Sequence, residues 1–273
     1  MKYCITRLLL MVSMLCLLTP LEAMPTGDLK TQPVVICLDS ETQWPPYYYH
    51  PVDEHEGKTT HREGASIDLI HRVFDELAMP FVIKQMPWPR VLEALKKPSK
   101  DEFCEVSWDM SLNEERLSWL LFTEPIYQIS TGGFYNKNKL TGLDSFFGVA
   151  QLFSYEICGI RGYDYTPIDS LISIRVAREQ QALDLVALGR CDVFVSTVET
   201  IVYGAKMGIY KLNENTDYLV GRGFERIMYA VVSTASPRAK QLHKQLNKTL
   251  KQLKLSGETE VIFKKHIEKG TGF

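Results

Sequence analysis

Short runs of apolar residues alternate along this chain with stretches in which apolar residues recur at helical spacing. The runs at residues 34–38, 81–85 and 104–108 predict buried strands. Between the first two runs, residues 67–77 carry apolar side chains at helical spacing, with Ser66 as the expected N-cap. This alternation predicts an α/β fold with a mainly parallel sheet flanked by helices.

The second half of the chain repeats the same order. The expected elements are a strand, a helix, a strand and a helix, at residues 156–161, 175–187, 191–195 and 198–205. A late strand at 227–232 and an amphipathic helix at 239–253 follow. Two similar α/β units predict two lobes with a cleft between them, and clefts are where ligands bind.

The first 23 residues differ from the rest in composition. Lys2 and Arg7 precede an apolar run at residues 8–18 and a small residue, Ala23. A membrane span needs about 20 apolar residues, so this shorter run predicts a secretory signal peptide over residues 1–23 and export to the periplasm. The formal net charge of −2 and the lack of a basic stripe argue against a nucleic-acid partner.

Four cysteines lie beyond residue 23, at positions 37, 104, 158 and 191. Four cysteines allow three pairings. Each half of the chain has an Ile-Cys run followed by a Cys-acid-Val run, which favours one bridge per half, Cys37–Cys104 and Cys158–Cys191. Exported proteins permit disulfides, whereas the alternative is four buried thiols.

Several short motifs follow one another along the chain. They are Trp44-Pro45-Pro46-Tyr47, Gly64 to Ile70, Trp88 to Leu92, Ser111 to Arg116, Phe122 to Tyr127, Gly189 to Asp192 and Leu253 to Gly257. In this order and spacing they resemble the bacterial extracellular solute-binding proteins of family 3, the amino-acid-binding type. The resemblance implies a two-lobed type II periplasmic-binding-protein fold with two hinge crossings. Lobe one would comprise residues 33–128 plus 225–268, and lobe two residues 131–222.

The resemblance also implies a ligand site. Arg116 matches the family arginine that takes a ligand carboxylate, a role that suits a permanently charged, bidentate guanidinium. The alternative for Arg116 is a solvated arginine beside two glutamates. Ser111 matches a hydroxyl position of the site, and its alternative is a helix N-cap.

Aromatic residues are the next candidates. Trp88 aligns with a residue that stacks on the ligand in this family, and Trp44 and Tyr48 lie on the loop after the first strand. Aromatic rings supply large, rigid contact area in clefts, although ordinary packing is the alternative for each of them. Arg161, Tyr163 and Asp164 belong to a loop before a helix of lobe two, and any of the three is expected to contact the ligand.

Two positions depart from the family pattern. Asp109 stands where the family commonly has a small hydroxyl residue, so it would read a ligand amine or hydroxyl, or pair with Arg116. Thr197 stands where amino-acid binders usually place the aspartate that holds the α-ammonium. This loss puts a plain α-amino-acid ligand in doubt.

Catalytic and cofactor signatures are missing from the sequence. We find no nucleophile elbow, Walker loop or dinucleotide fingerprint, and the histidines at 50, 55 and 61 lack metal-ligand spacing. We therefore expect no metal, no cofactor and no enzyme activity. The resemblance implies a monomeric binding protein that captures a small polar, carboxylate-bearing solute for an ABC importer's permease. A dehydratase-like enzyme on the same scaffold and a ligand sensor for a membrane receptor are the alternatives.

Overall fold

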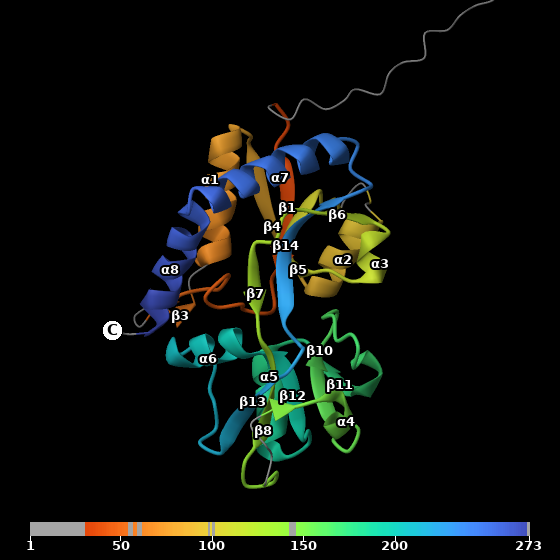
Figure 1. Cartoon of the computed structure of the whole chain (residues 1–273), viewed down its shortest axis with the longest axis vertical. Coiled ribbons are helices and arrows are strands. Elements are labelled where there is room, and N and C mark those ends of the chain that lie inside the picture. Colours follow the sequence, from red (N-terminus) through yellow and green to blue (C-terminus); the bar gives the residue numbers. More distant parts are fainter. Residues whose placement is uncertain are drawn as a thin grey trace, which may run out of the picture.

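The computed structural model describes residues 31–53, 57–58, 62–97, 99, 102–141 and 146–271. The expected signal peptide, residues 1–23, lies outside them. The described chain forms a mixed α/β molecule with two sheets, each flanked by helices, stacked along the long axis (Figure 1). This confirms the predicted fold class. Within the described residues, no helix is long and apolar enough to cross a membrane.

The first sheet builds lobe one. Its strands lie in the order β4-β1-β5-β14-β6, with β7 also paired to β14: β4 Phe81–Met86, β1 Val34–Asp39, β5 Val106–Ser111, β14 Arg226–Ser233, β6 Leu120–Phe122 and β7 Tyr127–Ile129. Strand β1 is parallel to β4 and β5, whereas β14 is antiparallel to β5. Strand β14, late in the chain, therefore belongs to the same sheet as β1, at its beginning.

Helices cover both faces of this sheet. They are α1 Ala65–Leu77, α2 Trp88–Lys96, α3 Glu114–Leu117, α7 Ala239–Leu255 and α8 Glu258–Thr271. One core joins α1 and α7 to the sheet through Ile36, Phe74, Trp108 and Leu246, all of them buried. A small hairpin of β2 Val52–Asp53 and β3 Gly57–Lys58 stands apart from this sheet.

The second sheet builds lobe two, in the order β11-β10-β12-β8-β13-β9. Its strands are β11 Ile172–Val176, β10 Ile157–Ile160, β12 Val193–Thr197, β8 Thr131–Asn136, β13 Thr216–Gly221 and β9 Phe146–Phe147. Its helices are α4 Val149–Leu152, the 3-10 turn Asp169–Leu171, α5 Glu179–Leu188 and α6 Val198–Lys206. One sequence expectation is wrong here, because residues 175–176 belong to strand β11 and not to the following helix. The sequence analysis also did not foresee β8, β9, β11, β13 and α4.

The chain crosses between the sheets at two places. One crossing runs from β7 through Ser130 into β8, and the other runs from β13 through residues 222–225 into β14. Figure 1 shows both crossings side by side at the waist of the molecule. The Ser130 amide donates to both carboxylate oxygens of Glu199 at 3.0 Å, which ties the first crossing to α6. The exact lobe boundaries stay a prediction.

Both predicted disulfides are present. Cys37 in β1 pairs with Cys104 just before β5, and Cys158 in β10 pairs with Cys191 just before β12. The Cα–Cα distances are 5.7 and 6.0 Å, within the usual range for a disulfide. Each bridge lies within one lobe, so neither restricts movement of one lobe relative to the other.

Candidate functional site

A pocket opens where the two lobes meet. Its cavity volume is about 100 Å³, several times what a single buried water needs. Lobe one supplies the ends of β1 and β5 with the loops that follow them, and lobe two supplies the loop after β10 and the end of β12. The pocket brings together nine of the ten predicted ligand residues, namely Trp44, Tyr48, Trp88, Asp109, Ser111, Arg116, Tyr163, Asp164 and Thr197.

Arg116 is buried, with 5% of its surface exposed. Helix α3 holds it there, because Asn113 caps that helix by accepting a hydrogen bond from the Arg116 amide at 2.9 Å. Its Nη1 donates to the Ser111 carbonyl at 2.8 Å and to Ser111 Oγ at 2.9 Å, and Nη2 donates to the Gly162 carbonyl of lobe two at 3.3 Å. The guanidinium is thus a fixed positive charge at the pocket wall.

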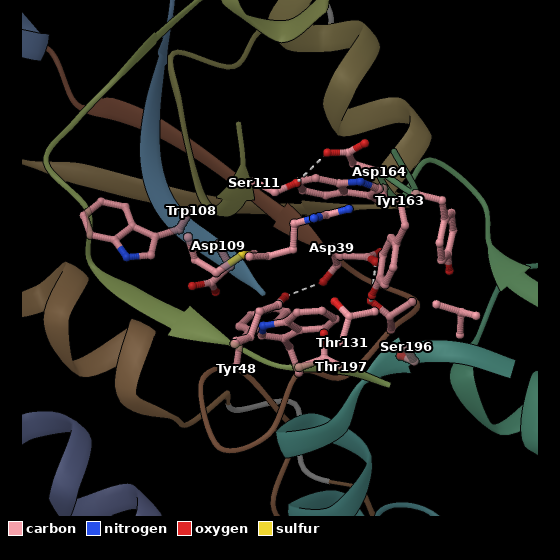
Figure 2. Close-up of a pocket in the computed structure, with 18 of the residues that line it drawn as sticks. Asp39, Tyr48, Trp108, Asp109, Ser111, Thr131, Tyr163, Asp164, Ser196 and Thr197 are labelled. Carbon is pink, nitrogen blue, oxygen red and sulfur yellow. Dashed lines mark hydrogen bonds between the residues drawn. The ribbon is translucent and has the colours of Figure 1, made fainter. Parts of the chain in front are cut away.

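The same arginine lies close to a carboxylate of lobe two. Ser111 Oγ donates to Asp164 Oδ2 at 3.4 Å (Figure 2). Burial lowers the pKa of the Arg116 guanidinium, and the negative charge of Asp164 acts in the opposite direction and raises it. Gly162 beside it has φ of +78°, a conformation suited to glycine, and its carbonyl also accepts from Trp88 Nε1 at 3.1 Å. These contacts join the two lobes above the pocket.

Asp109 also lines the pocket, two residues before Ser111 on β5 (Figure 2). Ser66 Oγ donates to its Oδ1 at 2.6 Å and the Tyr127 hydroxyl donates to the same atom at 2.8 Å. Ser66 was the expected N-cap of α1, but Gly64 occupies that position and Ser66 instead turns to Asp109. Burial raises the pKa of the Asp109 carboxyl to about 6, although both hydrogen bonds lower it.

Aromatic side chains form much of the remaining wall. Trp44 meets Tyr163 of lobe two edge-on at 5.5 Å between ring centroids, and its Nε1 donates to the Tyr127 hydroxyl at 3.1 Å. Tyr48 is buried, with the Arg62 guanidinium 4.0 Å from its ring centroid. These rings make a rigid, largely apolar surface beside the charged groups.

Polar side chains that the sequence interpretation did not single out complete the pocket. Trp108 and Ser196 are among the residues that line it, and Trp108 Nε1 and Ser196 Oγ have no hydrogen-bond partner within the described chain. The Trp108 indole points away from the other labelled side chains (Figure 2), into the core of lobe one. Buried polar atoms nearly always have partners, which makes Ser196 Oγ the candidate for a contact with a solute. Asp39 also lines the pocket, as does Asp164, which the sequence interpretation had named as a possible ligand contact together with Arg161 and Tyr163. Asp39 was within reach of sequence reasoning, because it directly follows the apolar run 34–38 that predicts a parallel strand, and the ends of such strands form binding crevices.

Arg161 is the predicted ligand residue that the structure places elsewhere. Its side chain is exposed and its Nε donates to the Arg175 carbonyl at 3.3 Å. It does not line the pocket. The turn that follows β10 directs Tyr163 and Asp164 inward and leaves Arg161 at the surface.

Two acidic residues, Glu179 and Asp39, are linked through Tyr163 and Thr42 where lobe two meets the loop after β1. Glu179 at the start of α5 is 1% exposed, and its Oε1 accepts from the Tyr163 hydroxyl at 2.8 Å. Tyr163 OH also lies 3.4 Å from Thr42 Oγ1, which donates to Asp39. Burial, and to a smaller extent the charge of Asp39, raise the pKa of the Glu179 carboxyl to about 8. Glu179 is therefore mostly protonated at neutral pH.

We expect Glu179 to make folding sensitive to alkaline pH. A carboxyl whose pKa is raised in the folded state stabilises the protein most at low pH, and this contribution is lost as pH rises from near 4.5 to about 8. Between pH 7 and 9 the loss is about 1.4 kcal/mol. Glu179→Gln should remove that part of the pH dependence in urea unfolding, whereas exposed Glu214→Gln should keep it. Equal pH slopes in wild type and Glu179→Gln would contradict the assignment.

Metal ligands do not gather in the described chain, where no group of three or more His, Cys, Asp or Glu side chains is placed to hold an ion. The pocket offers instead two arginines, Arg116 and Arg226, three aspartates, and hydroxyls and aromatic rings from both lobes. This arrangement suits reversible binding of a small polar molecule.

Comparison with solved structures gives the same architecture. The substrate-binding protein of an amino acid ABC transporter matches with a TM-score of 0.69 at 18% identity, over 87% of this chain and 100% of that chain. AbpA from Streptococcus pneumoniae, an amino acid ABC transporter substrate-binding protein bound to L-arginine, matches at 0.68 and 16%, over 87% and 95%. A histidine kinase sensor domain with similarity to periplasmic binding proteins matches at 0.67 and 17%, over 86% and 96%.

Comparison with curated proteins gave no match. The family model of bacterial extracellular solute-binding proteins, family 3, matches residues 36–269, nearly all of the described chain. Nearly all of both lobes, both crossings and the pocket lie within that range. The chain belongs to the bacterial extracellular solute-binding proteins of family 3.

Proposed function

We propose that this protein captures a small polar solute bearing a carboxylate and delivers it to an ABC-type importer. The observation that carries the proposal is the buried guanidinium of Arg116 at the wall of a pocket lined by both lobes. An arginine can hold a carboxylate through two parallel hydrogen bonds, and a partly desolvated site strengthens them. Ser196 Oγ, which has no hydrogen-bond partner within the described chain, would bind a further polar group of the same solute.

Binding would be coupled to movement of the lobes. Contacts between them run through a few polar groups, including Gly162, Tyr163 and Tyr210, the last of which donates to the Gln43 carbonyl. Since the two crossings are short and the disulfides lie within lobes, we propose closure about these crossings as the response to ligand. A permease that recognises the closed form would be the partner.

Membership of this extracellular family implies a periplasmic or extracellular location. We propose the periplasm, reached through removal of residues 1–23, and a monomeric state. Mass spectrometry of the protein exported by its native host would report the cleavage site, and size-exclusion chromatography with light scattering would report the mass. A dimer would contradict the monomeric state, and an uncleaved chain would contradict the removal of residues 1–23.

The direct test is a thermal-shift panel of amino acids, hydroxy acids, dicarboxylates and amines. A ligand that binds only the folded state stabilises it by about 2.7 kcal/mol at one hundred times its Kd, which gives a clear rise in melting temperature. We expect the solutes that raise it to carry a carboxylate. A panel without any shift, or one in which only the amines raise the melting temperature, would overturn the proposal.

A second candidate is a sensor that reports the same solute to a membrane receptor. It is favoured by the likeness to a histidine kinase sensor domain, which places such a role on the same fold. The ligand chemistry would be identical, so affinity measurements do not separate the two. Co-purification from native membranes would, because a permease or a kinase would be recovered with the closed, liganded protein.

A further inference from the structure

We propose that the exposed face of α7 in lobe one binds an anionic lipid surface. Figure 1 shows α7 crossing the end of lobe one that faces away from lobe two. A location outside the cytoplasm, which the family implies, brings the protein to the outer side of the membrane. This interaction is separate from solute binding, because none of the residues involved lines the pocket between the lobes.

Two stripes with the same spacing run along α7 on opposite faces. The first stripe is buried and consists of Leu242, Leu246, Leu250 and Leu253. The second, the basic stripe, is exposed and consists of Lys240, Lys244, Lys248 and Lys251. Each stripe repeats at intervals of four, four and three residues, so its members share one face of the helix. The offset of two residues between the stripes places them on opposite sides, and the ammonium groups therefore form a row in solvent.

The protein does not neutralise the positive charge of the basic stripe. Helix α7 contains no aspartate or glutamate. None of the four lysines forms an ion pair with a described residue. On the neighbouring helices α1 and α8, Glu76 and Glu258 both pair with Arg72, at 2.8 Å each. The basic stripe is thus an uncompensated cationic surface on a chain whose formal net charge is −2.

An exposed apolar residue continues the basic stripe. Leu255 is 79% exposed, more than any other large apolar side chain of the described chain. It lies four residues after Lys251 and therefore on the same face of α7. A single exposed leucine is ordinary on a protein surface, but here it extends a row of lysines. A lipid surface binds both kinds of side chain, because headgroup phosphates attract the ammonium groups and the acyl boundary accepts the leucine.

The structure corrects the expected lack of a basic stripe. In the sequence, the lysines alternate with leucines and glutamines and form no continuous run. Once residues 239–255 fold into α7, the lysines align on its outer face. Since α7 lies at the end of lobe one away from lobe two (Figure 1), contact with a flat lipid surface leaves the pocket between the lobes uncovered.

Vesicle sedimentation tests the proposal. The protein exported by its native host is mixed with phosphatidylcholine vesicles that contain either no anionic lipid or about one third phosphatidylglycerol. In about 0.1 M salt we expect binding to the anionic vesicles alone, and about 0.5 M salt should release the protein, because salt screens the attraction. Equal binding to both kinds of vesicle would overturn the proposal.

A stripe variant combines Lys240→Gln, Lys244→Gln, Lys248→Gln and Lys251→Gln. It should bind anionic vesicles at least about 100-fold more weakly, since each lysine near such a surface contributes about fivefold. The control has the same change in net charge at four exposed positions of lobe two and combines Lys137→Gln, Lys139→Gln, Lys206→Gln and Lys211→Gln. Its binding should stay within about threefold of wild type, because charges beyond a Debye length are screened. All variants share one N-terminus, so any contribution of residues 1–23 cancels.

Leu255→Ser distinguishes a lipid surface from a soluble polyanion. We expect it to weaken binding to anionic vesicles about 3- to 10-fold, because the leucine is no longer buried at the acyl boundary, and to leave retention on immobilised polyphosphate unchanged. Equal vesicle binding by wild type and the stripe variant would show that this face of α7 is merely solvated and would overturn the proposal. Unchanged vesicle binding by Leu255→Ser, with tighter binding to polyphosphate than to vesicles, would overturn it in favour of a soluble polyanion. No solute is present in these measurements, so they leave the proposed function untouched.

Discussion

Arg116→Met is expected to weaken binding of the carboxylate-bearing solute at least 100-fold. The variant loses the bidentate charge-assisted interaction, and each hydrogen bond to a charged group contributes about 1.5–3 kcal/mol. Arg116→Lys keeps the charge but not the planar fork that also binds the Ser111 and Gly162 carbonyls, so we expect an intermediate loss of about 10-fold or more. Isothermal titration with the solute that shifts the melting temperature most would measure both.

The matched control is Arg161→Met. Sequence reasoning placed Arg161 among the ligand residues, whereas the structure places it at the surface outside the pocket. Its loss should leave affinity within about twofold, since surface substitutions away from a site have small effects. If Arg161→Met abolished binding and Arg116→Met did not, the assignment of the carboxylate position would be wrong.

The α/β architecture and the two disulfides were predictable because each rests on a repeated local pattern. The Ile-Cys and Cys-acid-Val runs occur once per lobe, and the structure pairs them within each lobe. The boundary of α5 was not predictable in the same way. Apolar spacing from residue 175 onwards suits a helix, but Arg175 and Val176 lie beside Gly159 and Ile160 and are recruited into the sheet. Pairing between strands distant in sequence overrides local preference there.

Among the pocket residues, too, some were predictable from local sequence patterns and others were not. Arg116, Ser111 and Trp88 stand in motifs that carry their own spacing, so their place in the pocket follows from the sequence. The position of Asp109 in the pocket depends on a register shift against β14, more than one hundred residues later, which no local pattern reveals. Trp108 and Ser196 were missed for a related reason: they sit in apolar strands, and only tertiary structure tells which polar atoms remain without partners.

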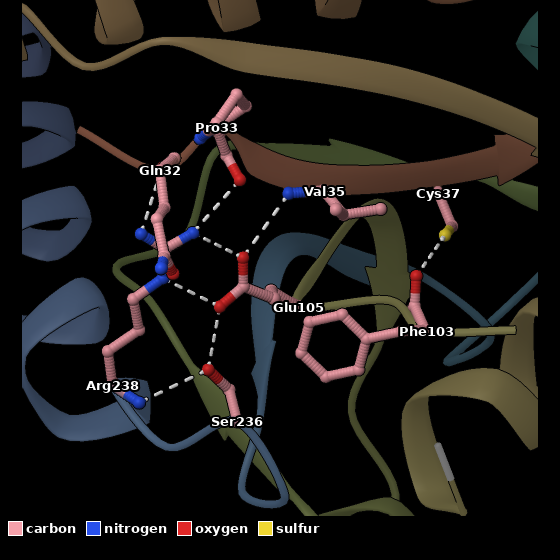
Figure 3. A network of polar contacts seen from close by, with 8 residues as sticks. All are labelled: Gln32, Pro33, Val35, Cys37, Phe103, Glu105, Ser236 and Arg238. Atoms are coloured by element: carbon pink, nitrogen blue, oxygen red, sulfur yellow. Dashed lines mark hydrogen bonds and ion pairs between the residues drawn. The ribbon is translucent and has the colours of Figure 1, made fainter. Parts of the chain in front are cut away.

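The substitution with the largest expected effect on stability lies far from the pocket, at the start of β1 in lobe one. Glu105 and Arg238 are 2% and 4% exposed and form a bidentate ion pair, with Nε–Oε1 at 2.8 Å and Nη2–Oε2 at 2.6 Å (Figure 3). Ser236 Oγ and the Val35 amide also donate to Glu105. Burial alone would raise the pKa of Glu105, but these hydrogen bonds outweigh it and lower the pKa.

The network fastens the first described residues to the connection between β14 and α7. Arg238 donates from Nη1 to the Gln32 carbonyl at 2.9 Å and from Nη2 to the Pro33 carbonyl at 3.0 Å. The beginning of β1 is thus held against a segment about two hundred positions later. A charge-dense network of this kind is costly to leave half-made, because a buried carboxylate without its partner keeps the full desolvation penalty.

Arg238→Met should therefore lower the free energy of unfolding by about 3–5 kcal/mol in urea titrations. Glu105→Gln together with Arg238→Met should cost less than the sum of the single changes, because the double variant leaves no unpaired buried charge. The exposed Lys96–Glu115 pair is the control, because exposed ion pairs contribute little and Lys96→Met should change the free energy of unfolding far less than Arg238→Met. A loss below 1 kcal/mol for Arg238→Met, or strict additivity in the double variant, would show that the pair contributes no more than a surface contact. Solute binding by the folded fraction should be unchanged, since neither residue lines the pocket between the lobes.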